Sequence, residues 1–308
     1  MMKLMKMPEA QATFGRFAAS SHIYAPPSAE ADLFIGADKE DINTLLTGSP
    51  LFLGQAGSGK SGGVGRCAEQ ILAQNLTILI ADITGEHEGI VQMFADRFER
   101  ITRLDKPEED AARYCNGDKC FYYDMSAFSR GEYLKYFDAF LKAAHDVKVE
   151  IYKQNTDKVR MQIFIFEEAQ NLVPESAPAA DKETVAALFR VREHIKWCGT
   201  QGRKYGYCIW LITQRPSMCA KDIISQSRVR FMLKVFEKND VDVYATMLAG
   251  SKRSELLQTL NSMKPGECFF VADGKISMRR FKRKKSKDMG QTPGFAQTVG
   301  WKAAVKVE

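Results

Sequence analysis

Long apolar runs are missing from this 308-residue sequence. No stretch reaches the roughly 18 uninterrupted apolar residues that a membrane-spanning helix requires. The basic start, MMKLMKMPEA, is not followed by the apolar core of a secretory signal. We therefore expect a cytoplasmic protein without a membrane span. Hydrophobic residues still make up 45 % of the chain and charged residues 27 %, a globular composition that excludes a mainly disordered or collagen-like chain.

Metal-binding and disulfide patterns are also missing. The seven cysteines are an odd number, and the closest pair, Cys115 and Cys120, has no second Cys or His pair placed to complete a zinc site. We predict reduced thiols. The histidines share no spacing suited to a metal or to a nucleophile and its base, so we assign them no role; they are His22, His87, His145 and His194.

Excess positive charge is confined to one segment. The formal net charge is +6, and residues 279–287 (RRFKRKKSK) alone contribute seven basic side chains. We predict a basic C-terminal tail over residues 276–308. A like-charged block of this density either holds nucleic acid through its phosphates or is a solvated tail, and both interpretations stay open.

Short apolar runs alternate with helical patterns from about residue 46 onward, whereas residues 1–45 are weakly periodic and are predicted as an N-terminal arm. The runs are nearly continuous, as in strands buried on both faces of a parallel sheet. The predicted strands are 50–53, 76–83, 120–125, 161–166, 207–213, 229–236 and 268–272. The predicted helices are 60–74, 132–146, 182–197, 240–249 and 253–261, with a polar insertion at 104–119. This pattern predicts an α/β domain over residues 46–275, with a mostly parallel doubly wound sheet flanked by helices.

A phosphate-binding loop motif, G-x-x-x-x-G-K-[ST], lies between the first predicted strand and the first predicted helix. Its residues are Gly54, Gln55, Ala56, Gly57, Ser58, Gly59, Lys60 and Ser61. The glycines let backbone N–H groups surround an anion. The lysine neutralises the β- and γ-phosphates, and the serine hydroxyl binds Mg²⁺. We therefore predict ATP and Mg²⁺ as cofactors.

Paired carboxylates, Glu167 and Glu168, follow the apolar run 161–166. Phosphoryl transfer with a metal ion needs one carboxylate near the metal and another that polarises the attacking water. We assign Glu167 to the metal, together with Ser61, and Glu168 to the water. Seen alone, such a pair is more often the start of a capped helix.

Two further polar residues flank the apolar run 207–213. Gln214 follows it and is predicted to sense the γ-phosphate and the water, although a simple turn before Pro216 explains it too. Arg203 precedes the run in a glycine-flanked loop, from which a guanidinium can extend into a neighbouring site.

Six segments resemble, in their order along the chain, the motifs of the HerA–FtsK superfamily of hexameric DNA-translocating ATPases, most closely its HerA branch. These segments are GQAGSGKS, ADITGEHEG, FYYDMSAFS, QIFIFEEAQNLVP, GRKYGYCIWLITQRPS and MKPGECFFV. The resemblance covers residues 46–272 and implies a RecA-like P-loop domain in a six-membered ring, with ATP between subunits and DNA in the channel. By the same resemblance, Glu168 is the catalytic carboxylate, Gln214 the sensor, and Arg203 the finger that reaches the next subunit. Two features depart from the family: Glu167 replaces the usual Asp, and the N-terminal β-barrel of HerA helicases has no counterpart here.

The leading hypothesis is an ATP-driven motor that moves double-stranded DNA as a homo-oligomeric ring, with a nuclease or capsid protein as a possible partner. The alternatives are a viral or mobile-element genome-packaging ATPase, and a nucleotide-gated binding protein with little hydrolysis. Candidate DNA contacts are residues 173–183 and the basic side chains of Arg190, Arg192 and Lys196. A solvated helix face explains the latter three equally well.

Overall fold

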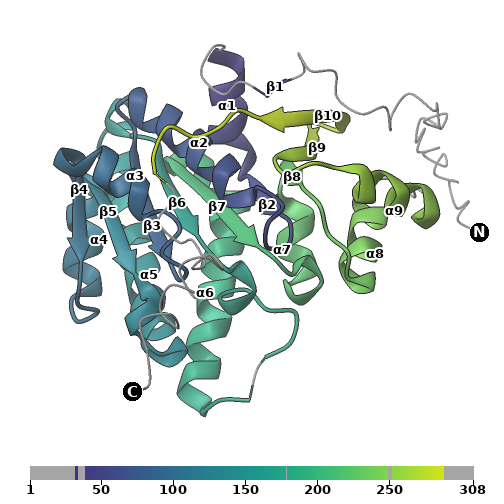
Figure 1. The fold of residues 1–308 in the computed structure, drawn as a ribbon. Helices are drawn as coiled ribbons and strands as arrows, with labels where there is room; N and C mark the ends of the chain where they lie inside the picture. The colour runs from purple at the N-terminus through teal and green to yellow at the C-terminus, as the bar shows by residue number, and fades with distance from the viewer. Residues whose placement is uncertain (1–31, 34–38, 178, 249–251, 288–308) are drawn as a thin grey trace, which may run out of the picture.

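A mixed β-sheet forms the middle of the protein in the computed structural model, which describes residues 32–33, 39–177, 179–248 and 252–287 (Figure 1). The strands are β1 (Asp32–Leu33), β2 (Leu51–Leu53), β3 (Thr77–Asp82), β4 (Phe98–Ile101), β5 (Cys120–Asp124), β6 (Gln162–Phe166), β7 (Tyr207–Thr213), β8 (Val229–Met232), β9 (Glu267–Ala272) and β10 (Lys275–Phe281). Within the described residues the sheet has the order β1-β10-β9-β8-β2-β7-β6-β3-β5-β4. Neighbours are parallel except for β9, which is antiparallel to both β8 and β10.

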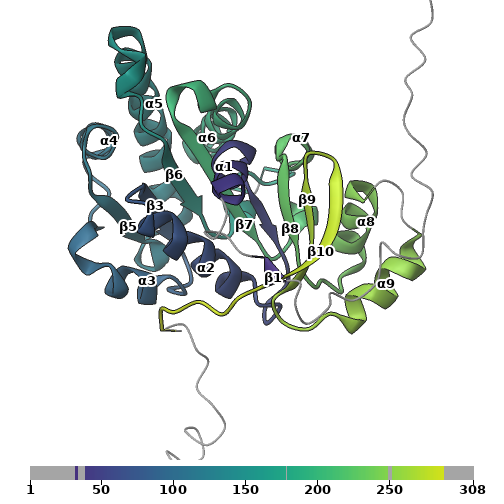
Figure 2. The ribbon, with the colours of Figure 1, turned by 90° about the horizontal axis from the view of Figure 1, so that it is seen from above.

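Helices cover both faces of this sheet (Figure 2). They are α1 (Lys39–Gly48), α2 (Lys60–Ala73), α3 (Glu88–Met93), α4 (Pro107–Asn116), α5 (Arg130–Gln154), α6 (Lys182–Thr200), α7 (Lys221–Gln226), α8 (Lys238–Met247) and α9 (Arg253–Ser262). Successive strand residues point to opposite faces. In β2, Phe52 joins the core beneath α1, α2 and α3, whereas Leu51 and Leu53 join the core beneath the other helices. The predicted doubly wound α/β fold is confirmed.

All of the predicted strands and helices are present. Their ends shift by up to four residues, except that the helix predicted over 132–146 extends to Gln154. The predicted polar insertion at 104–119 is wrong, because most of it forms α4. This helix begins at Pro107, and its first turn carries Glu108, Glu109 and Asp110, a composition that suits a helix N-terminus. The edge strand β4 was not predicted, because its sequence FERI carries two charged residues and no apolar run.

The prediction of a tail beginning at residue 276 is wrong for residues 276–281, which form most of β10. Ile276 pairs with Val271 and Met278 with Phe269 of β9. The strand ends at Phe281, which is 8 % exposed, and the ring centroid of Phe281 lies 5.1 Å from that of Phe231. The density of basic residues hides this alternating apolar pattern. Residues 288–308 of the predicted tail, and most of the predicted arm, lie outside the described residues.

Replacing Phe281 with alanine tests whether β10 belongs to the core. We expect the free energy of unfolding to fall by about 3 kcal/mol, because a buried ring is lost from between Phe231 and α2. Urea unfolding followed by circular dichroism measures the change. The neighbouring exposed Arg283→Ala should change stability by less than about 0.5 kcal/mol. Equal stability of the Phe281→Ala variant and the unaltered protein would contradict the assignment.

Candidate functional site

The loop that joins β2 to α2 is held in place by neighbouring backbone. The N–H of Gly54 donates to the carbonyl of Thr213 at the end of β7 (3.2 Å), and the N–H of Gln55 donates to the carbonyl of Lys234 after β8 (3.0 Å). Gly57 and Gly59 adopt φ values of 76° and 88°, a region that glycine occupies without steric cost. The predicted loop, residues 54–61, therefore has a fixed shape at the carboxyl edge of the sheet.

This loop presents polar groups that lack protein partners. Lys60 is 4 % exposed, and its ammonium makes no hydrogen bond or ion pair with any described residue. The buried hydroxyl of Ser58 also has no hydrogen-bond partner in the described part of the chain. A Cβ placed on Gly57 would meet nothing within 4 Å. An open cradle at the N-terminus of a helix, lined by unsatisfied donors, suits a phosphate group.

Glu167, at the end of β6, is buried in a charged network. Its Oε1 atom lies 2.8 Å from Nε2 of His87, and its Oε2 atom accepts a hydrogen bond from the hydroxyl of Thr84 (2.9 Å). Burial alone would raise the pKa of the carboxyl group. The charges of His87 and Lys60 and the two hydrogen bonds outweigh burial and lower this pKa to about 2.

His87 is the residue that sequence reasoning missed, since we had assigned it no role. Burial opposes its protonation, but Glu167 and Asp82 outweigh burial and raise the pKa of the imidazole above its ordinary value. Asp82 shapes the turn that carries His87: its carboxylate accepts hydrogen bonds from the N–H groups of Gly85 (2.9 Å) and His87 (2.9 Å). The turn that carries His87 follows β3, which pairs with β6 in parallel, and this neighbour relation brings His87 to Glu167.

Glu168 and Gln214, which follow the adjacent parallel strands β6 and β7, lie together. The amide Nε2 of Gln214 donates to Oε1 of Glu168 (2.6 Å). Gln170 donates to the other carboxylate oxygen of Glu168 and accepts a hydrogen bond from the hydroxyl of Thr213 (2.6 Å). Glu168 itself has φ 48°, a left-handed conformation that is uncommon for a non-glycine residue and is often found at functional sites.

Ser61 donates its hydroxyl hydrogen to Glu86, which lies in the segment ADITGEHEG. Among the described residues no group of three or more His, Cys, Asp or Glu side chains could hold a metal ion by itself. The oxygen donors of Ser61, Glu86 and Glu167 nevertheless have the chemistry that Mg²⁺ prefers. They suit an ion that keeps waters and takes its remaining ligands from phosphates.

Arg203 lies apart from the other predicted site residues. It is exposed in the short 3₁₀ helix Gly202–Tyr205, at the amino end of β7. The loop 54–61 and Gln214 lie at the carboxyl edge, and the seven residues of β7 separate the two edges by about 20 Å. The fold therefore does not bring Arg203 to the loop of its own chain.

The basic side chains on α6 have acidic partners. Arg190 pairs with Asp138 at 2.7 Å, while Arg192 and Lys196 pair with Asp222 at 2.6 and 3.1 Å. Because these basic side chains already have acidic partners, the contacts favour the interpretation of a solvated helix face over that of a helix that binds DNA phosphates.

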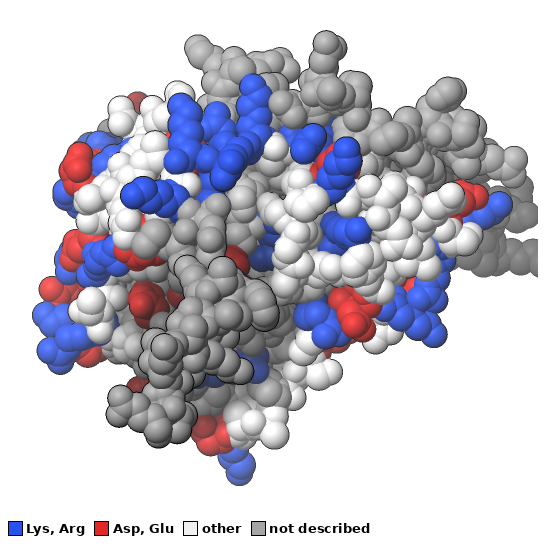
Figure 3. Space-filling view, viewed as in Figure 1, with Lys and Arg blue, Asp and Glu red and all other residues white. Residues whose placement is uncertain are grey.

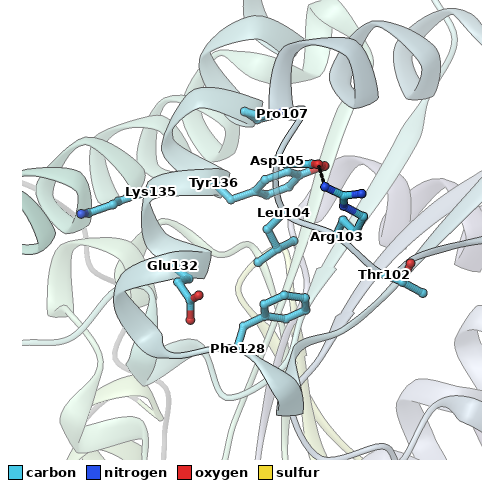
Figure 4. Close-up of a pocket in the computed structure, with 9 residues that line it drawn as sticks. All are labelled: Thr102, Arg103, Leu104, Asp105, Pro107, Phe128, Glu132, Lys135 and Tyr136. Atoms are coloured by element: carbon cyan, nitrogen blue, oxygen red, sulfur yellow. Dashed lines mark ion pairs between the residues drawn. The ribbon is translucent and has the colours of Figure 1, made fainter.

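A separate open pocket of about 520 Å³ lies beyond the ends of β4 and β5 (Figure 4). Its lining is Thr102, Arg103, Leu104, Asp105, Pro107, Phe128, Glu132, Lys135 and Tyr136. No predicted site residue contributes to this pocket, and four strands (β7, β6, β3 and β5) lie between β2 and β4 in the sheet. We therefore place the candidate site at the loop 54–61 and not in this pocket.

The sheet topology and the phosphate loop define a RecA-like P-loop ATPase fold. Solved structures support this fold. VirB4 of Thermoanaerobacter pseudethanolicus aligns with a TM-score of 0.56 at 12 % identity, over 85 % of this chain and 99 % of that chain. The genome packaging NTPase B204 from Sulfolobus turreted icosahedral virus 2, in complex with AMPPCP, aligns with a TM-score of 0.50 at 14 % identity, over 76 % and 97 % of the two chains. At such identities the likeness shows the fold alone.

The family described as "Helicase HerA, central domain" matches residues 39–207, and the chain belongs to this family. The resemblance to the HerA–FtsK superfamily is thereby confirmed. A search of curated proteins finds no match. Family and fold together support ATPase activity in general. Within the described residues, no helix has the length and apolar character to cross a bilayer.

Replacing His87 with alanine tests the buried ion pair with Glu167. We expect the free energy of unfolding to fall by about 3 kcal/mol at pH 6, because the variant leaves a buried carboxylate without its cation. The raised pKa of His87 stabilises the folded protein fully below pH about 6.5 and less as pH rises through that pKa. The cost of the substitution should therefore shrink by pH 8.5, as measured by urea unfolding at both values.

His194→Ala is the matched control for this prediction. Burial lowers the pKa of His194 despite the opposing charge of Asp138, so the cost of losing this histidine should grow, not shrink, between pH 6 and pH 8.5. A cost of His87→Ala that is the same at both pH values would contradict the ion pair.

Proposed function

We propose that the protein is an ATP-hydrolysing motor that translocates double-stranded DNA as a homo-oligomeric ring, in the manner of a HerA-like helicase or translocase. One observation carries the proposal. The Glu168–Gln214 pair lies on the strand ends next to an open phosphate loop, and such a pair serves hydrolysis, whereas nucleotide binding alone does not require it.

In this proposal the residues divide the reaction between them. Residues 54–61 bind the phosphates of ATP, with Lys60 at the β- and γ-phosphates. Ser61 and Glu167 would hold Mg²⁺, which would neutralise the charge of the phosphates. Glu168 accepts a proton from the attacking water, whose oxygen forms a bond to the γ-phosphorus as the bond to ADP breaks. Gln214 senses the outcome through its hydrogen bond to Glu168.

Glu167 replaces the aspartate that is usual in the superfamily, and its surroundings support a role despite the longer side chain. Both of its oxygens are held, one by His87 and one by Thr84. A carboxylate fixed in this way keeps its charge and its position beside Lys60, which is what a partner of a metal-bound water requires.

The position of Arg203 supports the proposal of a ring. Because it lies at the opposite edge of the sheet from its own loop, it can act only on the nucleotide of another copy. We propose that Arg203 of one subunit contacts the γ-phosphate held by its neighbour and stabilises the charge that develops there.

A genome-packaging ATPase is the second candidate, and the fold of the B204 packaging NTPase, aligned over nearly its whole length, supports it comparably. Both candidates share ATP hydrolysis and duplex DNA, and they differ in the partner, a nuclease or a capsid protein. A nucleotide-gated binding protein is the third candidate. It predicts ATP turnover that is slow and indifferent to DNA.

Glu168→Gln tests the hydrolytic role. We expect the rate of phosphate release in the presence of long duplex DNA to fall by a factor of about 10²–10⁴, because the water loses its base, while binding of a fluorescent ATP analogue persists. The exposed Glu108→Gln is the matched control and should keep normal turnover. Unchanged turnover in Glu168→Gln would refute the assignment of this residue.

Mixing two inactive variants tests the ring. Arg203→Ala and Glu168→Gln should each lack DNA-stimulated turnover, and a mixture should regain part of it, because some interfaces combine an intact Glu168 with an intact Arg203 from the next copy. Lys204→Ala, at the adjacent exposed position, should stay active alone. Absence of recovery in mixtures that exchange subunits would argue against an arginine donated by the neighbour.

A further inference from the structure

Helix α2 contains glycines that nucleotide binding does not explain. The phosphate loop ends at Ser61, yet Gly62, Gly63 and Gly65 follow inside the helix, where each costs up to about 1 kcal/mol relative to alanine. A Cβ on Gly63 would lie 2.6 Å from the ring of Phe281, and one on Gly65 would lie 2.9 Å from Cδ of Lys284. Gly63 therefore makes room for Phe281 at the end of β10, and Gly65 makes room for Lys284 in the chain that follows it.

We call residues 282–287 the basic strap. It crosses α2 and reaches α3 (Figures 1 and 2). A Cβ on Gly89 of α3 would lie 2.0 Å from the carbonyl oxygen of Lys287, so only glycine permits this contact. Gly65 on α2 and Gly89 on α3 thus fit the course of the strap, and Gly63 fits the end of β10 that leads into it.

A buried carboxylate fixes the strap to α2. Glu69 is 4 % exposed, and its Oε1 atom accepts hydrogen bonds from the backbone N–H groups of Lys285 (2.8 Å) and Ser286 (2.7 Å). Arg66 pairs with its other oxygen at 3.2 Å. Burying a carboxylate is costly unless its hydrogen bonds are satisfied, and here two of its partners are the backbone of the strap.

The strap presents a dense row of positive charge. Its sequence KRKKSK has five basic residues and one serine, and no acidic residue occurs between Asp273 and Asp288. The side chains of Lys282, Arg283, Lys285 and Lys287 are exposed. Figure 3 shows Lys and Arg side chains gathered at the top of the molecule, over the region where Figure 1 draws α2 and the end of β10.

We propose that the basic strap is a preformed binding site for the phosphate backbone of double-stranded DNA. The choice of DNA as the partner rests on the proposed function. The inference of a phosphate-binding site rests on the contacts and charges of the strap. The six residues of the strap, which bends at Lys285 and Ser286, span at most about 20 Å, a length that covers several successive phosphates of one strand. The strap has no apolar or aromatic side chain that could contact bases, so binding is independent of sequence. Because Glu69 and the glycines already order its backbone, less conformational entropy is lost on binding.

The decisive experiment replaces Lys282, Arg283, Lys285 and Lys287 with glutamine in the full chain. Binding of a long fluorescent DNA duplex is then measured by anisotropy at several salt concentrations. We expect affinity at 0.1 M salt to fall at least about 30-fold. The slope of log K against log salt should become shallower by about 3.6, because each of the four phosphate contacts contributes about 0.9.

A charge-matched variant separates the strap from net charge. Lys142, Lys153, Lys158 and Lys238 are exposed lysines outside the strap, and their replacement by glutamine removes the same four charges. This control should lose less than about 3-fold in affinity and keep its salt slope. Equal losses in the two variants, or none in the strap variant, would overturn the proposal. Thermal unfolding of both variants excludes a folding defect.

Two further arms complete the test. Glu69→Ala keeps every basic side chain of the strap but releases its backbone. This variant should weaken DNA binding several-fold with the salt slope nearly unchanged, and an unaltered affinity would show that the fixed geometry is irrelevant.

Vesicles containing phosphatidylserine test an anionic lipid surface, and stronger binding to these than to DNA would overturn the choice of partner. If the unaltered protein binds no duplex at all, the proposed function fails; if it binds and the strap variant binds equally, only the present proposal fails.

Discussion

The parallel pairing of β2, β7, β6 and β3 is the constraint on which the site depends. These four strands lie side by side and end at the same edge, so segments far apart in the sequence meet there. The loop 54–61 follows β2, Gln214 follows β7, the two glutamates follow β6, and the turn with His87 follows β3. Within this edge the charges are interdependent: Lys60 and His87 both favour the ionised form of Glu167, and the charge of Lys60 opposes protonation of His87.

The loop and the edge residues were predictable for a physical reason. A phosphate cradle requires glycines and a lysine at fixed local spacing, so its signal lies within eight residues. Glu168 and Gln214 were also predictable, since polar residues that directly follow buried parallel strands converge. His87 was not, because its partner Glu167 is 80 residues away and their meeting depends on β3 lying next to β6, a neighbour relation that no local pattern encodes.

Charge density misled the prediction in two other places. In α4 the acidic first turn and the polar outer face concealed Ala111 and Tyr114, which are fully buried. In β10 the arginines concealed Ile276 and Met278, which are half-buried on one face of the sheet, and Phe281, which is buried on the other. In both segments the apolar residues that reach the core are few, and charged residues lie close to them in the sequence. The strap is also dense in charge, and its sequence alone is equally typical of a solvated tail. In the structure, however, its backbone is held against α2 and α3.

Electron cryomicroscopy of the full chain with a non-hydrolysable ATP analogue and long duplex DNA tests the central claim most directly. The account predicts a closed ring around the duplex. In each interface, the triphosphate lies on residues 54–61 of one copy, with the guanidinium of Arg203 from the neighbouring copy at the γ-phosphate. Isolated subunits under these conditions, or a nucleotide bound away from Lys60 and Glu168, would contradict it.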